Sequence, residues 1–585
     1  MSETPQNQLE VVQPVPAAEG MAAGARWRIV LAYALVAALA AMLYVPYVLR
    51  GGYITDDWGY VKNAQDFPQF WSSVRHYFPL MSHRPLVPLV MSAETALLGD
   101  RPWAYILVNL LLWFGFAALL CRMLSRRFGH VFGVSLLILA TVPVLSSAAV
   151  FWPLAMTGGT LSLLMWSVSF ALVIRDAERG RYSLWAYLPL LACMMLYEAV
   201  LPLFVLTAML PVLRVRDVNA RGDGVQRSCT PYKLAARYVL PPAIIALLPA
   251  LSQKLFLPWL LPRIGVSAEV VTRINVSPSG AAVGGASWAF ALLGGQVLLW
   301  AHGVWAALTD WNVALHLAPM AAAALGALAL ARQASRLSGQ PPLAGQRRSA
   351  LAVLLICLAA GSVIFLFSGQ LACFSGGCAN RTLIATWVAQ ALVLALLAAT
   401  WKSRIMLGVV AAIFVASAAG MIVQEANCVK SWQLQQQVRA AFTAAADEQD
   451  MAGGATVIAD VPRTVGGRYF YATVFQTPWD WGAMVAMPRG ARGDQGAVLG
   501  ARQPAGLEVM REDQRLTIHD WWKAELREVW FFRYDPQAGR GTLRKVRDAE
   551  DFDQILEDVR RTNLNPRPPA IEERLAMQFL GTLGQ

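Results

Sequence analysis

The stretch IVLAYALVAALAAMLYVPYVL (residues 29–49) decides the class of fold. It contains no charged side chain, and a helix of this length crosses the hydrocarbon core of a bilayer, which is about 30 Å thick. The rest of the chain agrees, because 56% of its 585 residues are hydrophobic and only 15% are charged. Soluble proteins carry about 25% charged residues. The sequence therefore predicts a polytopic α-helical membrane protein.

Apolar runs of similar length recur along the chain and predict about eleven transmembrane helices. We expect them at residues 27–49, 103–121, 131–149, 158–174, 183–200, 201–213, 238–257, 312–331, 349–368, 382–400 and 405–423. Basic residues gather in alternate connections, for example at Arg26 and Arg28, at 122–127 and at 214–237. By the positive-inside rule, these connections and the N-terminus are cytoplasmic.

The segment 288–308 does not fit this alternation of sides. Counted as a full span, it would place the Arg-rich connection 332–348 on the outer face, against the positive-inside rule. We therefore interpret it as a re-entrant or interfacial helix that is anchored by its tryptophans. The outer loops are then expected at 50–102 and 258–311.

Composition divides the chain into three parts. Residues 1–25 are polar, so we expect a disordered cytoplasmic N-terminus. Residues 26–423 contain the apolar runs and form the transmembrane domain. Residues 424–585 are polar, with strand-like pieces at Thr456–Asp460 and Val529–Tyr534. This tail is therefore expected to be a small, soluble, extracytoplasmic α/β domain.

Several classes of function lose support at this stage. The net charge is +12, but the basic residues lie in short connections and form no stripe of the kind that binds nucleic acid. The chain has no Walker phosphate loop, no dinucleotide fingerprint and no HExxH zinc motif. An ATP-driven transporter, a dehydrogenase and a zinc protease of that type are disfavoured, and we expect no nucleic-acid partner.

Two of the seven cysteines fall in an expected outer loop, in the stretch Cys373-Phe-Ser-Gly-Gly-Cys378. The glycines allow the chain to turn, and an oxidising compartment favours a disulfide between Cys373 and Cys378. The alternative is two free thiols in a Gly-rich turn. A metal site of the CxxC type is disfavoured, because no second Cys/His pair accompanies them.

The stretch YITDDWGY (residues 53–60) follows the first apolar run. Either Asp56 or Asp57 can act as a general base toward a hydroxyl, because neighbouring carboxylates repel and one pKa rises toward the useful range. The flanking Tyr53, Trp58 and Tyr60 would provide faces on which a sugar stacks. The alternative is that the two aspartates only end a turn and cap a helix.

Other ionisable residues lie at the ends of spans on the same expected face, where they are costly and so are candidates for function. His83 and Arg84 precede Pro85 at a helix start, where the helix dipole favours an anion such as a phosphate. Glu198, a lone acid between apolar spans, is either a site residue or a buried salt-bridge partner. The remaining candidates for holding a phosphate are Lys254, Arg263, Arg273 and Arg381. For each cation the alternative is an anchor to lipid headgroups.

With these residues in view, the sequence resembles the GT-C superfamily of integral-membrane glycosyltransferases, which use sugars linked to lipid phosphates. The resemblance rests on Asp56-Asp57-Trp58-Gly59, on His83-Arg84-Pro85-Leu86, on the span opening Gly99 to Asn109, and on Tyr197-Glu198. It covers about the first 200 residues, and the rest only as topology. It looks most like bacterial O-antigen, lipid and pilin glycosyltransferases, and is similar also to protein O-mannosyltransferase-like proteins. The loop 151–156 departs from the pattern, because it contains no acid.

The resemblance implies an inverting transfer of a sugar from a polyprenyl-phosphate donor to a hydroxyl of a glycan, lipid or protein acceptor. It places this reaction on the periplasmic face of a bacterial inner membrane. Asp56 or Asp57 would be the base, with Asp56 preferred, and Glu198 an acid on the acceptor side. Holding the phosphate would fall to the arginines Arg84, Arg263, Arg273 and Arg381. Members of the superfamily differ in metal use, so Mg²⁺ or Mn²⁺ at the acidic pair stays open.

Elementary chemistry agrees with this set of residues, because a phosphate leaving group needs positive charge and no general acid. The main alternative is a membrane transporter or a flippase for lipid-linked sugars without transferase activity. Transporters often contain repeats with broken helices in corresponding positions, and we find no such repeat. An acyl- or phosphoethanolamine transferase would need a nucleophile or a metal cluster, which the scattered histidines do not provide.

Overall fold

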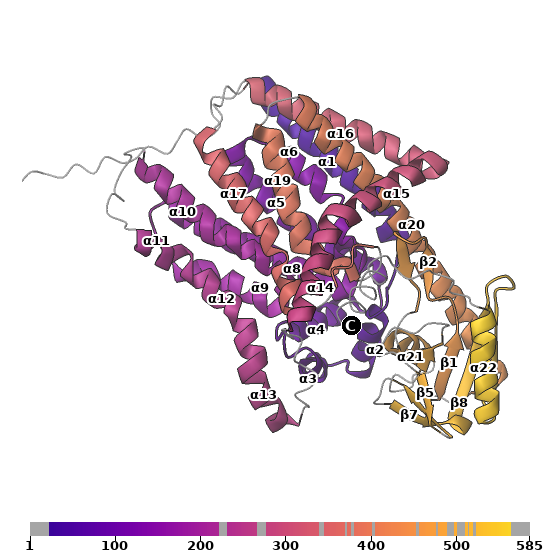
Figure 1. The fold of residues 1–585 in the computed structure, drawn as a ribbon. Helices are drawn as coiled ribbons and strands as arrows, with labels where there is room; N and C mark the ends of the chain where they lie inside the picture. Colours follow the sequence, from indigo (N-terminus) through magenta and orange to yellow (C-terminus); the bar gives the residue numbers. More distant parts are fainter. Residues whose placement is uncertain are drawn as a thin grey trace, which may run out of the picture.

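The computed structural model consists of a large helical bundle followed by a smaller unit of helices and strands (Figure 1). It describes residues 23–220, 231–265, 277–337, 344–368, 371–375, 379–400, 404–451, 455–475, 478–487, 496–499, 509–512, 514–518 and 522–562. The expected polytopic α-helical architecture with a small C-terminal α/β part is confirmed.

Nine helical segments of the described residues are long and apolar enough to cross a membrane. They contain α1 (Ala23–Arg50), α5 (Pro102–Phe128), α8 (Pro153–Glu178), α12 (Leu240–Leu251) with α13 (Leu257–Leu260), α14 (Pro278–Phe290) with α15 (Gln296–Thr309), α16 (Trp311–Leu337), α17 (Ala344–Ala360) with α18 (Val363–Ser368), α19 (Ile384–Thr400) and α20 (Arg404–Glu448). Shorter helices complete the bundle: α6 (His130–Ala140), α7 (Ala148–Phe151), α9 (Leu188–Leu196), α10 (Phe204–Ala220) and α11 (Pro231–Tyr238).

Some expected spans are broken in the structure. In the range 131–149, α6 ends at Ala140, shortly before Pro143. In the range 183–200, α9 ends at Leu196 and is followed by a 3₁₀ turn that contains a proline. A proline has no backbone N–H, and its ring clashes with the preceding turn of a helix. Hydropathy therefore located these apolar segments but overstated the length of their helices.

Helices α1 and α16 pack side by side and run antiparallel. Gly326 of α16 lies against Leu35 of α1. His316, near the start of α16, and Arg50, at the end of α1, are both in electrostatic range of Glu425 of α20. The last turn of α16 therefore lies beside the first turn of α1, as Figure 1 shows. We call this the basic end of the bundle, because Arg26 of α1 and Arg332 and Arg336 of α16 belong to it. The other end we call the acidic end.

The helix formed by α14 and α15 is long enough to span a membrane, but its contacts stay near the acidic end. Its Trp288 donates a hydrogen bond to Thr386 in the first turn of α19, at 3.2 Å. His302 stacks on Phe470 of the C-terminal unit, with ring centroids 5.9 Å apart. The helix then leads directly into α16, which starts beside Arg50. Because the segment is also one of the nine candidate spans, the interpretation of 288–308 as a re-entrant or interfacial helix stays a prediction.

The connection between α1 and α5 folds into three short helices: α2 (Asp57–Asp66), α3 (Phe70–Leu80) and α4 (Val87–Leu98). They lie at the acidic end, between the bundle and the C-terminal unit (Figure 1). Helix α4 packs on α8, and α2 contacts α4, α8 and α21 of the C-terminal unit. We call residues 51–62 the acidic segment.

The C-terminal unit is an α/β structure built on a four-stranded sheet in the order β4-β1-β8-β9. Strand β1 (Thr456–Asp460) pairs parallel with β4 (Gly496–Val498) and β8 (Val529–Asp535), and β9 (Arg540–Lys545) is antiparallel to β8. Two smaller antiparallel sheets contain β2 (Thr464–Gly466) with β3 (Tyr471–Thr473), and β5 (Val509–Glu512), β6 (Arg515–Ile518) and β7 (Trp522–Glu525). Its helices are α21 (Pro478–Ala486) and α22 (Ala549–Thr562).

Helix α20 runs without a break through the expected boundary at 423/424 and extends into the C-terminal unit. The hydrophobic core of that unit includes Val438 and Phe442 of α20 together with Trp481 of α21. The same core also contains Tyr53 and Trp58 of the acidic segment. The acidic segment is therefore packed into the C-terminal unit, although it is more than 350 residues away in sequence.

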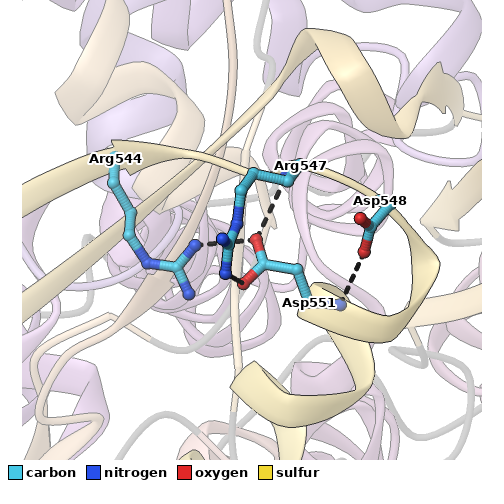
Figure 2. Close-up of polar contacts among 4 residues, drawn as sticks. All are labelled: Arg544, Arg547, Asp548 and Asp551. Atoms are coloured by element: carbon cyan, nitrogen blue, oxygen red, sulfur yellow. Dashed lines mark hydrogen bonds and ion pairs between the residues drawn. The ribbon is translucent and has the colours of Figure 1, made fainter.

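Helix α22 begins with two carboxylates that satisfy backbone donors, and Figure 2 shows this cluster. Asp548 accepts a hydrogen bond from the backbone N–H of Asp551 at 2.9 Å, which caps the first turn. Asp551 accepts from the Arg547 backbone at 3.0 Å and from the Arg544 guanidinium at 2.7 Å. The hydrogen bond from Arg544 lowers the pKa of Asp551 to about 2.

We predict that Asp551→Asn lowers the free energy of unfolding of the C-terminal unit by about 1 kcal/mol at pH 7. Both arginines are largely exposed, so solvent screening keeps the contribution of the ion pairs small. The folded-state pKa lies below the ordinary value, so this stability is present above about pH 4 and is lost as the pH falls toward 2. Thermal unfolding should show the difference at pH 7 and a smaller one near pH 2.5. An equal difference at both pH values contradicts the assignment.

Candidate active site at the acidic end

The acidic segment begins with two glycines that leave room for neighbouring rings. A Cβ atom at Gly52 would lie 2.0 Å from the Trp432 ring, and one at Gly51 would lie 2.4 Å from the Tyr47 ring. Thr55 follows with a φ of 41°, in the left-handed region that β-branched residues rarely adopt. This tight turn separates Tyr53 from Asp56. After it, the side chain of Asp57 is buried and that of Asp56 is partly exposed.

Asp57 is fully buried, and both of its carboxylate oxygens are hydrogen bonded to the backbone. One oxygen accepts from the N–H of Ile54 and the other from the N–H of Ala155, each at 3.0 Å. Ala155 lies in the first turn of α8, so Asp57 satisfies a backbone donor that the helix leaves without an internal partner. Burial raises the pKa of Asp57 to about 8, although these N–H groups act in the opposite direction.

Asp56 is the more exposed member of the pair. It lies at the N-terminal cap of α2 without capping it through its side chain, and its backbone carbonyl accepts the N–H of Tyr60 at 3.1 Å. Burial raises the pKa of Tyr60, the Asp56 carboxylate raises it further, and Arg381 acts in the opposite direction. Asp56 and Arg381 therefore lie within electrostatic range of the same phenol.

Arg84 and Glu198 form a two-pronged ion pair. The Nε and Nη2 atoms of Arg84 donate to the two oxygens of Glu198 at 2.7 and 2.5 Å. The guanidinium also lies 4.5 Å from the centre of the Tyr197 ring. Tyr60 is among the groups that act on the charge of Arg84. Glu198 is therefore a salt-bridge partner, one of the two roles that the sequence left open, and its role as a site residue stays a prediction.

Arg381 belongs to a short 3₁₀ helix, Ala379–Leu383, that is held beside the start of α8. Asn380 accepts a hydrogen bond from the backbone of Ala148 and donates one to Ser147, both at 3.0 Å. The guanidinium of Arg381 lies 4.7 Å from the centre of the Trp152 ring, directly before α8. The start of α8 therefore supports both Arg381 and Asp57.

The structure places the other candidates less centrally. Tyr53 and Trp58 are each 1% exposed, so their rings support the segment from within the core. His83 is buried beside Arg84, and its charge acts on Glu198. Arg263 is exposed and stacks on Trp259, with the guanidinium 3.9 Å from the ring centre.

Lys254 and Arg263 lie on the segment of α12 and α13, which projects from the bundle in Figure 1. Arg273 lies outside the described residues. Cys373 is partly buried in the loop 371–375, and Cys378 is outside the described residues, so the expected disulfide stays a prediction.

The acidic pair does not fit a divalent-cation site in the described part of the chain. No group of three His, Cys, Asp or Glu side chains is close enough to hold a metal there. Both oxygens of Asp57 accept backbone N–H groups, whose partial positive charge would repel a cation. The chemistry below therefore uses only side chains of this chain.

Glu94 is a candidate that the sequence reading missed. It lies on α4, is 8% exposed, and neither of its oxygens has a hydrogen-bond partner among the described residues. The neighbouring Thr157 hydroxyl donates to the Pro153 carbonyl at 2.9 Å instead. Burial raises the pKa of Glu94 to about 8, and Asp57 contributes in the same direction. The sequence pattern that pointed to Glu198 also applies to Glu94, because Glu94 is a lone acid in an apolar helix.

The fold and the site define a polytopic membrane protein with an acid and two arginines gathered at one end of its bundle. No family model matches the chain. No curated protein matches it either. Its structure is similar to the crystal structure of ArnT from Cupriavidus metallidurans bound to undecaprenyl phosphate, over 82% of this chain and 86% of that chain. The identity is 16% and the TM-score 0.30, a likeness too loose to support an argument about function.

We predict that Glu94→Gln makes the stability of the protein less dependent on pH in the range between about pH 5 and pH 8. A folded-state pKa of about 8 exceeds the ordinary value of about 4.3, so the stability that the neutral form contributes is fully present only below about pH 4, declines as the pH rises, and is gone once the pH passes 8. The stability of the wild type relative to the variant should fall by up to about 1.4 kcal/mol per pH unit below pH 8, where the folded carboxyl is still protonated and the unfolded one is ionised, and should level off above 8. Thermal unfolding between pH 6 and 9 measures this, with the exposed Glu448→Gln as control. Parallel pH profiles for wild type and Glu94→Gln would contradict it.

Proposed function

We propose that this protein is an inverting glycosyltransferase of the GT-C type. It would move a sugar from a polyprenyl-phosphate donor to a hydroxyl of a glycan, lipid or protein acceptor, at the periplasmic face of the membrane. The observation that carries the proposal is the grouping of Asp56, Arg381 and Arg84 around Tyr60. This grouping offers one partly exposed base and the positive charge that a phosphate leaving group needs.

In the proposed reaction, Asp56 accepts the proton of the acceptor hydroxyl as its oxygen attacks the anomeric carbon of the sugar. The bond between that carbon and the phosphate oxygen breaks, and the phosphate leaves with the electron pair. Attack opposite the leaving group inverts the configuration at the carbon. No general acid is required, because the departing oxygen belongs to a phosphate and not to an alkoxide.

The two aspartates take different parts in this proposal. Asp57 has both oxygens engaged by backbone N–H groups, so it holds the turn and leaves Asp56 as the base. The two arginines also differ. Arg381 interacts with Trp152 and lies beside the start of α8, so it is the main candidate for the phosphate. Arg84 is engaged by Glu198, which fixes its guanidinium and leaves its remaining N–H donors for the substrate.

The proposed placement on the periplasmic face follows from the charges at the opposite end of the bundle. Arg332 and Arg336 of α16 lie at the basic end, with the start of α1. By the positive-inside rule the basic end is cytoplasmic, so the acidic end faces the other compartment. The C-terminal unit shares the acidic end and would be periplasmic with it.

We predict that Asp56→Asn lowers kcat by about 10²- to 10⁴-fold, because the variant loses the base. Arg381→Ala should lower both kcat and the affinity for donor, whereas Arg101→Ala, an exposed control, should change neither.

Asp57→Asn should mainly reduce the amount of folded protein, because one backbone N–H would face an amide donor. The measurement is transfer of radiolabelled sugar from a polyprenyl-phosphate donor to membrane acceptors, at equal protein abundance. Full activity of Asp56→Asn would contradict the assignment of Asp56 as the base. Movement of the lipid-linked donor across the membrane without transfer of its sugar would favour a flippase.

The topology has its own test. We predict that a reporter active only in the periplasm is active when it is fused after residue 585 and inactive when it precedes residue 1. A reporter inserted in the connection 338–343 should behave like the N-terminal fusion, because α16 ends and α1 begins at the basic end. A cytoplasmic C-terminus would contradict the assignment of the acidic end to the periplasm.

A further inference from the structure

The turn that presents Asp56 is strained and therefore has to be held by its surroundings. Thr55, directly before Asp56, has a φ of 41°. A β-branched residue in the left-handed region is costly and persists only where neighbouring contacts enforce it. Two local backbone hydrogen bonds contribute, since the N–H groups of Asp57 and Trp58 donate to the carbonyls of Ile54 and Thr55 at 3.2 and 3.1 Å. Contacts from elsewhere in the molecule add to them.

One side chain of α20 bridges the two ends of this turn. The Nε2 atom of Gln435 donates to the backbone carbonyl of Tyr53 at 3.1 Å, before the strained residue. Its Oε1 atom accepts from the indole Nε1 of Trp58 at 2.6 Å, after the aspartates. Thr55, Asp56 and Asp57 therefore lie between two anchor points that a single amide group holds.

The amide of Gln435 is itself fixed in orientation. Its second N–H donates to Ser431 Oγ at 3.1 Å, and Ser431 donates to the carbonyl of Thr473 in β3 at 2.5 Å. A reversed amide would set its N–H groups against the indole N–H of Trp58, so the network allows one orientation. Gln435 and Ser431 are both fully buried, where a hydrogen bond is stronger than in water.

Aromatic packing encloses the same bridge. Trp432, three residues before Gln435, lies under Gly52, and its ring centre is 5.6 Å from that of Tyr53 and 5.8 Å from that of Trp58. Arg439, one turn later, lies over Trp58 at 5.7 Å. Successive turns of α20 therefore contact the acidic segment along a single helix face.

We infer that Gln435 is a positioning residue, through which the C-terminal unit holds the acidic turn and directs the carboxylate of Asp56. The inference rests on the proposed function, since it assigns to this bridge the alignment of the proposed base. It makes the C-terminal unit a component of the active site rather than a separate acceptor-binding module. Gln435 touches no substrate and acts only through the backbone of the turn.

The first test is the change Gln435→Leu, which keeps the size of the side chain and removes its three hydrogen bonds. Misplacement of a catalytic group by about 1 Å can reduce the rate about 100-fold. We therefore expect kcat to fall by about 10- to 100-fold. The KM for the lipid-linked donor should stay within about threefold of wild type, because the arginines are untouched. Gln433→Leu is the matched control, since Gln433 is exposed on the same helix and should behave as wild type.

The second readout needs no assumption about the reaction. Hydrogen exchange of the peptides that cover residues 51–62, measured in lipid nanodiscs, reports how firmly the turn is held. Gln435→Leu should speed exchange in these peptides, while peptides of α5 and of α22 keep the wild-type rate. If Gln435→Leu does not accumulate, Trp58→Phe removes one of the three hydrogen bonds, the one between the indole and Gln435 Oε1, from its other end and keeps an aromatic ring in the core.

The exchange and kinetic measurements together distinguish a failure of the positioning role of Gln435 from a failure of the proposed function. Faster exchange together with lower kcat and an unchanged KM supports both. Unchanged exchange in residues 51–62 overturns the positioning role, whatever the enzyme transfers. Faster exchange with full activity also overturns it, because the turn would then be held without consequence for the base. Faster exchange in a protein whose wild type transfers no sugar supports the mechanical link and overturns the proposed function.

Discussion

The buried carboxylate of Asp57 is the contact on which the arrangement of the acidic end depends. It joins the N–H of Ile54 in the turn to the N–H of Ala155 at the start of α8, and so attaches the acidic segment to the bundle. Because successive residues diverge, fixing Asp57 inward leaves Asp56 toward the partly exposed side. The same start of α8 carries Trp152, under the guanidinium of Arg381. One helix terminus thus determines the relative positions of the proposed base and the proposed phosphate site.

The turn is held from its other side by Gln435, so it lies at a junction between two parts of the chain. The bundle provides Asp57's partner, and α20 provides the bridge between Tyr53 and Trp58. Each of these contacts spans the strained Thr55, and together they hold it from two sides. This double attachment explains why the aromatic residues of the segment are packed into the core of the C-terminal unit. In this arrangement the rings of Tyr53 and Trp58, which flank the aspartates, pack in that core and hold the segment in place.

The sequence predicted the class of fold, because a run of apolar residues has few alternatives to a membrane helix. It also singled out Asp56, Arg84, Glu198 and Arg381, since charges beside spans are costly in any arrangement. It could not separate Asp56 from Asp57, because their roles depend on backbone donors nearly 100 positions away in α8. Nor could it find Gln435, whose partner Trp58 is 377 positions distant and whose residue type is unremarkable in a polar helix. The breaks in the helices near Pro143 and Pro202 arise from local backbone chemistry that a hydropathy window averages out.

The charges of the site follow the charges of the proposed reaction. Arg84 and Glu198 cancel each other, and Asp56 and Arg381 provide one charge of each sign. During transfer the leaving phosphate gains one negative charge as its ester bond breaks. In the same step Asp56 accepts a proton and loses its negative charge. The total charge at the acidic end therefore stays constant, and Arg381, no longer offset by Asp56, is left to stabilise the phosphate when its charge is greatest. A site with Asp57 as the base would lack this effect, because that carboxylate lies buried behind the turn among backbone N–H groups.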